Sequence, residues 1–146
     1  YKSVSSIMTT KLQSTFTEAD LSSLTLVCIP ASTVQDNISR YYKFSNILCS
    51  NTGMQNGFPH ISIVKEKMQS HLGGTDSAEY SYDADFFKGA NVILFDDVVT
   101  RGRSMYQMKS ALEQIGANVV CAISIGRTYS DYHGDNRTPH PWSGIY

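Results

Sequence analysis

The sequence predicts an α/β domain whose central, mainly parallel sheet is flanked by helices, and two observations lead to this class. Short apolar runs bounded by turn residues alternate with segments whose apolar residues recur at helical spacing. In order they predict strand, helix, strand, hairpin, strand, helix and strand, which is typical of parallel sheets built from crossover connections. The 146 residues fit one domain of ~100–150 residues, so we expect a single domain over 1–146.

The first half of the chain predicts a helical N-terminal region (1–22) and the start of a core (24–126). An amphipathic helix over 3–16 is indicated by apolar residues on one face: Val4, Ile7, Met8, Leu12 and Phe16. Residues 24–29 form an apolar run ended by Pro30, which predicts a buried strand. A helix is expected over 33–51, with its apolar face at Val34, Ile38, Tyr41, Phe44 and Leu48. Gly53 and Gly57 mark its end and the next turn, and residues 60–64 alternate like a strand.

The second half begins with a polar stretch, 65–82, that holds two adjacent glycines and returns through Tyr80 and Tyr82 at strand spacing. Long polar connections inside compact domains are usually functional or mobile, so we expect a flexible hairpin. Residues 92–95 predict a buried strand. A helix follows, with Ser104 and Gln107 as its capping box and Gly116 as its stop. A last strand is expected over 118–125, and residues 127–146 form an aromatic-rich tail or small hood.

Composition excludes several classes of function. Twelve basic and thirteen acidic residues give a net charge of −1, which disfavours a nucleic-acid partner or an anionic membrane because both need a basic surplus. No apolar run approaches the ~18 residues of a membrane span. The three cysteines form no CxxC pair, which excludes a zinc ribbon or dithiol site and suits a reducing, cytoplasmic location. The four histidines show no metal-ligand spacing.

The chemistry is concentrated in residues 92–104, where a buried strand ends on Asp96 and Asp97 and a short loop opens a helix. Backbone N–H groups of 101–104 lie at the helix N-terminus and can hold a phosphate. Hydroxyls of Thr100 and Ser104 add donors, and Gly102 permits close approach. Asp96 and Asp97 can accept hydrogen bonds from sugar hydroxyls or help hold Mg²⁺ through water.

This segment resembles the 5-phosphoribosyl-1-pyrophosphate (PRPP) motif of type I phosphoribosyltransferases: four apolar residues, two acids, two apolar residues (Val98 and Val99) and a small-residue loop. The resemblance implies that Asp96 and Asp97 contact the ribose hydroxyls, with Mg²⁺ nearby. It also implies that the loop binds the 5′-phosphate through Thr100, Arg101, Gly102, Arg103 and Ser104. The departure from the family pattern is Arg101, often Thr in the family, whose side chain must point out of the cradle.

Over roughly 24–126 the chain looks like the ComF-like (competence protein F) branch of these transferases, on residues 26–30, Arg40 and Phe44. The family binds pyrophosphate at the loop after the first strand, which is Ala31, Ser32 and Thr33 here. This loop has no glycine or basic residue, and Arg40 is expected to supply a charge.

Residues 65–82 stand where the family has its mobile catalytic hairpin, which excludes water from an oxocarbenium-like transition state. Lys65, Lys67 and His71 are the candidate cations beside the leaving group. Together with Asp96 and Asp97, Lys67 and His71 are the candidate catalytic residues.

Two main hypotheses of function follow. The first is a Mg²⁺-dependent phosphoribosyltransferase that moves phosphoribose between PRPP and a nitrogenous base. The second is a non-enzymatic PRPP- or nucleotide-sensing domain on the same fold, with a competence-related role as a further option. Either has a small-molecule ligand, and a homodimer is an option for both. Residues 92–97 could also be the acidic strand of a nucleotide hydrolase, but that class of enzyme needs a G-x-x-x-x-G-K-[ST] phosphate loop and the chain has none. A receiver-like acidic pocket leaves the loop 100–104 without a role.

Overall fold

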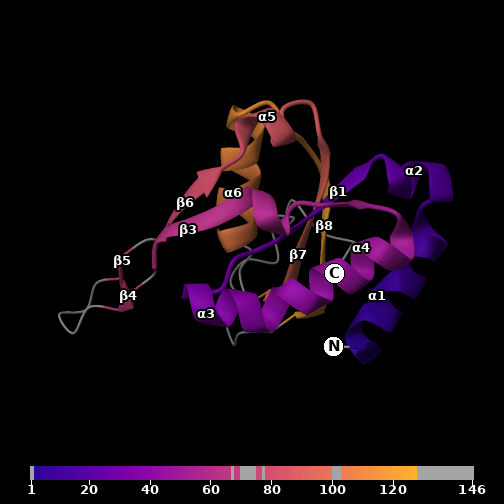
Figure 1. Ribbon diagram of the computed structural model, residues 1–146, viewed down its shortest axis with the longest axis horizontal. Helices are drawn as coiled ribbons and strands as arrows, with labels where there is room; N and C mark the ends of the chain where they lie inside the picture. Colours follow the sequence, from indigo (N-terminus) through magenta and orange to yellow (C-terminus); the bar gives the residue numbers. More distant parts are fainter. Residues whose placement is uncertain (1, 67, 70–74, 77, 100–102, 128–146) are drawn as a thin grey trace, which may run out of the picture.

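A four-stranded parallel sheet organises the fold of this computed structural model, which describes residues 2–66, 68–69, 75–76, 78–99 and 103–127 (Figure 1). The strand order is β2-β1-β7-β8, and every neighbouring pair is parallel. The strands are β1 (Leu24–Cys28), β2 (Gln55–Asn56), β7 (Asn91–Val99) and β8 (Asn118–Arg127). The predicted fold class is therefore confirmed, and β7 is longer than its apolar run because it includes the acidic pair.

Helices cover both faces of the sheet because side chains alternate along each strand. Leu26 and Ile93 belong to a core cluster shared with α1 (Lys2–Thr15), α2 (Glu18–Ser22) and α4 (Lys43–Thr52). Val27 and Leu94, each one residue on, belong to a second cluster with α5 (Ala84–Phe87) and α6 (Arg103–Gln114). Figure 1 shows α1 and α4 on one side of the strands and α6 on the other.

The N-terminal helix corrects one predicted contact. Met8 and Leu12 are buried as expected, but Ile7 is 59% exposed. Ile7 precedes Met8 by one residue, about 100° around the helix, so the buried stripe is narrower than the sequence pattern suggested.

The helix after β1 is not regular. It runs as α3 (Val34–Asn37), a π-helical turn η1 (Ile38–Tyr42) and α4. A π turn takes an additional residue and rotates the faces on either side of it. Consequently Tyr41, Phe44 and Leu48 are buried, whereas Val34 and Ile38, predicted on the same face, are exposed.

Three glycines shape the ends of elements. Gly53 and Gly116 end helices at φ of 81° and 97°, in the left-handed region that glycine adopts without strain. Gly57 lies so close to β1 that an added Cβ would be 2.6 Å from the Leu26 carbonyl oxygen.

The capping box predicted at Ser104 and Gln107 is wrong, because α6 begins at Arg103 and Ser104 therefore lies inside the helix rather than before it.

An antiparallel hairpin leaves the body of the domain at the 3₁₀ turn η2 (Phe58–His60). Its strands are β3 (Ile61–Lys65) and β6 (Glu79–Tyr82), continued by β4 (Met68–Gln69) and β5 (Thr75–Asp76). Figure 1 shows the β4–β5 end projecting away from the sheet. The predicted hairpin is thus present.

The predicted hood over 127–146 lies almost wholly outside the described residues. Within the described ranges, no helix has the length and apolar character needed to cross a bilayer.

Candidate functional site

A cleft of about 670 Å³ opens beyond the carboxyl ends of β1 and β7, where parallel α/β sheets bind ligands. We call it the central cleft. Its walls come from the loop after β1, the π turn, the end of β7, the first turns of α6 and the hairpin strand β6. The lining residues are Ile29, Pro30, Ala31, Ser32, Arg40, Ala78, Tyr80, Tyr82, Asp96, Asp97, Arg103, Ser104, Gln107 and Met108.

Asp96 is the half-buried member of the acidic pair. Its Oδ1 accepts two hydrogen bonds, from the Tyr41 hydroxyl at 3.2 Å and from the Asp97 backbone N–H at 2.9 Å. Burial, together with the adjacent Asp97 carboxylate, raises the pKa of Asp96 to about 7 despite these donors. The site therefore holds a carboxyl group that binds a proton more tightly than an ordinary aspartate does.

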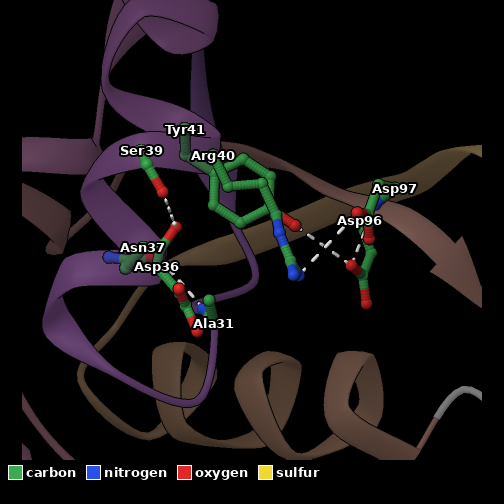
Figure 2. Close-up of polar contacts among 8 residues, drawn as sticks. All are labelled: Ala31, Asp36, Asn37, Ser39, Arg40, Tyr41, Asp96 and Asp97. Carbon is green, nitrogen blue, oxygen red and sulfur yellow. Dashed lines mark hydrogen bonds and ion pairs between the residues drawn. The ribbon is translucent and has the colours of Figure 1, made fainter.

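Arg40 faces the other carboxylate of the pair. Its guanidinium nitrogen lies 3.7 Å from Asp97 Oδ2, and both side chains are partly exposed to the cleft. Partial burial is the largest single influence on Arg40 and lowers its pKa, but Asp97, Tyr41 and Asp36 together outweigh it and the net shift is upward. Figure 2 shows Arg40 and Tyr41 extending side by side from the π turn toward the two aspartates. The structure thus places the predicted Arg40 next to the predicted acidic pair.

The loop after β1 uses its polar groups internally. The Ala31 N–H donates to Asn37 Oδ1 at 3.0 Å (Figure 2), and Thr33 caps α3 by accepting from the Asp36 N–H at 3.1 Å. The next N–H, that of Val34, donates to Glu66 of the hairpin at 2.8 Å. Of the three residues predicted to bind pyrophosphate, Ala31 and Ser32 line the central cleft and Thr33 does not.

The predicted phosphate loop is described only at its end. Arg103 and Ser104, on the first turn of the twelve-residue helix α6, line the central cleft. Val98 and Val99 continue β7 and pair with Gly126 and Arg127 of β8. Thr100, Arg101 and Gly102 lie outside the described residues, as do the hairpin candidates Lys67 and His71. Lys65 ends β3 and is exposed outside the cleft lining.

Three site residues were missed by the sequence analysis. Tyr41 was treated as a core residue, and Tyr80 and Tyr82 only as strand formers. Both hairpin tyrosines line the cleft, with ring centroids 6.4 Å apart in an edge-to-face pair, and burial raises the pKa of Tyr82 to about 12. A signal for Tyr41 existed, because a buried tyrosine needs a partner for its hydroxyl, but the sequence does not identify that partner.

Mg²⁺ fits this site only if water and substrate phosphates supply oxygen ligands in addition to the two aspartates. Within the described part of the chain, no three His, Cys, Asp or Glu side chains are grouped so as to hold a metal ion. Mg²⁺ commonly binds one or two carboxylates and completes its shell with water and substrate phosphates. The pair Asp96 and Asp97 is compatible with that arrangement.

Comparison with known proteins finds similarity both in sequence and in structure. No family model matches the chain. It is 28% identical over 100 residues to orotate phosphoribosyltransferase of Staphylococcus epidermidis, over 63% of this chain and 49% of that protein. The crystal structure of phosphoribosylpyrophosphate synthetase from Mycobacterium smegmatis matches with a TM-score of 0.52 and 17% identity, over 87% of this chain and 34% of that one.

The comparisons confirm the architecture: the chain has a type I phosphoribosyltransferase-like α/β fold. It spans about half the length of the curated relative that it matches. Neither similarity shows that the chain is nearer to the ComF-like branch than to other phosphoribosyltransferases, so membership of that branch stays a prediction.

Proposed function

We propose that this chain binds PRPP with Mg²⁺ and transfers phosphoribose to or from a nitrogenous base. The observation that carries the proposal is the convergence, in one cleft, of the acidic pair, the first turn of α6 and Arg40. The similarity to orotate phosphoribosyltransferase supports the same chemistry.

In this proposal the acidic pair accepts hydrogen bonds from the ribose hydroxyls, and the N-terminus of α6 faces the 5′-phosphate. The C1–oxygen bond to pyrophosphate breaks with its electron pair, and a ring nitrogen of the base bonds to C1 and releases its proton. Mg²⁺, when bound, neutralises pyrophosphate charge. The chain's own contribution is positioning and electrostatics, with Arg40 beside the leaving group and Tyr80 and Tyr82 limiting access of water.

A second candidate, a non-enzymatic PRPP or nucleotide sensor, is favoured by the loop after β1. The backbone N–H groups of Ala31, Val34 and Asp36 already donate to side chains of this chain. A pyrophosphate group would have to displace these acceptors. Such a loop is compatible with a domain that holds the phosphoribosyl half of its ligand without turnover.

Thermal unfolding with PRPP tests binding, and pyrophosphate release tests turnover. Ligand at about 100 times its Kd stabilises a protein by about 2.7 kcal/mol, so saturating PRPP with Mg²⁺ should raise Tm by roughly 5–13 °C. Ribose 5-phosphate should give a smaller rise. Asp97→Asn should abolish most of the shift, while Asp20→Asn, at an exposed position of α2, should keep it.

The outcomes separate the hypotheses. Binding with pyrophosphate release in the presence of orotate or another base supports the transferase, and binding without release for any base supports the sensor. If neither phosphoribosyl compound shifts Tm at millimolar concentration with Mg²⁺ present, both hypotheses are wrong.

A further inference from the structure

Tyr41 lies behind the acidic pair and is fixed in the core. Its side chain is 1% exposed. The ring makes edge-to-face contacts with Phe44 and Phe95, at centroid separations of 6.5 and 6.3 Å. Phe95 is the residue before Asp96 on β7, so the ring and its hydrogen-bond acceptor are anchored to the same strand. The hydroxyl therefore has one well-defined position.

That hydroxyl acts on the orientation of one carboxylate. The terminal torsion of an aspartate is broad, because rotation between an sp³ and an sp² carbon has shallow wells. Two donors that meet on Oδ1, the Tyr41 hydroxyl and the Asp97 N–H, remove that freedom. The Asp97 N–H alone leaves the carboxylate able to turn about this bond.

The π turn accounts for the arrangement. Arg40 and Tyr41 are consecutive residues of η1, and they contact the consecutive residues Asp97 and Asp96 respectively. Figure 2 shows both side chains directed to the end of β7. Single π turns inside longer helices are frequent at functional sites, and here the turn supplies one contact to each carboxylate.

We propose that Tyr41 is a positioning residue that orients the Asp96 carboxylate toward the hydroxyls of a ribofuranose phosphate. This inference rests on the proposed function, and it adds the element that makes the site selective for ribosyl over deoxyribosyl compounds. A carboxylate held in one plane distinguishes a ligand that offers the matching hydroxyl from one that lacks it, since the unmatched acceptor stays unpaired.

Calorimetric titration with two closed-ring probes tests the inference: methyl ribofuranoside 5-phosphate and its 2,3-dideoxy analogue. Tyr41→Phe removes only the hydroxyl and keeps both ring contacts. It should weaken binding of the ribofuranoside by about threefold to tenfold, the range of one hydrogen bond, and leave the affinity for the dideoxy analogue unchanged. The matched control is Tyr42→Phe, the next residue, which is 53% exposed and should change neither affinity.

Two results would overturn the inference while the proposed function stands. One is a Tyr41→Phe variant that binds the ribofuranoside as the wild type does. The other is an equal loss for both probes, which means that Tyr41 supports the fold of the cleft rather than the direction of one carboxylate. A wild-type protein that binds neither probe nor PRPP refutes the proposed function and the inference together.

Discussion

Asp96→Asn should stabilise the ligand-free protein at alkaline pH, although it removes a residue of the site. The Asp96 carboxylate is held in partial burial beside Asp97, and these surroundings raise its pKa to about 7 from the ordinary value of 3.8. Ionised Asp96 is therefore unfavourable in the folded state. An asparagine keeps the oxygen that accepts from Tyr41 and from the Asp97 N–H, and it carries no charge.

The sign of the pH dependence follows from linkage. A carboxyl group whose pKa is raised by folding binds more protons in the folded than in the unfolded state between the two pKa values. The wild type should thus lose free energy of unfolding as pH rises from about 4 to about 7, relative to the variant. A rise of this size in a sealed site would correspond to about 4 kcal/mol. Because Asp96 lines an open cleft and solvent screens it, we expect about 1–2 kcal/mol.

Urea unfolding of both proteins between pH 4 and pH 9 measures this difference. At pH 8 the variant should be more stable by about 1–2 kcal/mol, equivalent to roughly 2–10 °C in Tm, and at pH 4 the two should coincide. Asp85→Asn, which removes a charge from an exposed position of α5, should show no such pH-dependent gain. A constant difference across the whole range, or a wild type that is the more stable protein at pH 8, would refute the reasoning.

Three further predictions concern the scaffold. Gly57→Ala should destabilise the fold by about 1–3 kcal/mol through overpacking, because its Cβ would lie 2.6 Å from the Leu26 carbonyl oxygen. The added Cβ of Gly53→Ala meets no atom, so this variant should cost only about 1–2 kcal/mol of left-handed backbone strain. Urea unfolding of both variants compares the two losses of stability. Asp83 binds His60 at 2.9 Å and caps α5, and its pKa is lowered by the His60 hydrogen bond. The stability it contributes should be lost as pH falls below about 4, so the wild type and Asp83→Asn should converge in acid unfolding. Glu66→Ala should accelerate hydrogen exchange of the Val34 amide, which donates to Glu66, while Glu66→Gln keeps an acceptor and should protect it; equal rates in both variants would contradict this contact.

The sheet and the acidic pair were predictable because both depend on local pattern. Four consecutive apolar residues from Val92 to Phe95 are typical of a strand buried on both faces, and in the structure they are all buried. The two aspartates that follow must then lie at the carboxyl edge of the sheet. Their place in the cleft is a consequence of the parallel topology and needs no long-range information.

The other contacts of the site depend on partners far along the chain. Tyr41 lies on the π turn and donates to Asp96 on a distant strand, and the spacing of the helix's apolar residues does not predict that turn. The alternation of Tyr80 and Tyr82 predicted a strand, but not that this strand would face the cleft. The start of α6 was misjudged for a related reason: Ser104 and Gln107 have the spacing of a capping box, yet the helix already includes Arg103.

The energetic cost of Asp96 and the position of Tyr41 are connected. A charged carboxylate at this place could be avoided by a neutral side chain of the same shape, and the fold would gain stability. The Asp96 carboxylate is held by two donors and the Asp97 carboxylate lies beside a guanidinium, although these contacts only partly offset the repulsion within the pair. Such an arrangement is stable only where the surrounding core imposes it, and the ring contacts of Tyr41 with Phe44 and Phe95 do so here. A ligand that donates hydrogen bonds to the two carboxylates therefore reduces the repulsion between them that is present in the ligand-free protein. Binding also costs less free energy because the Asp96 carboxylate needs no reorientation.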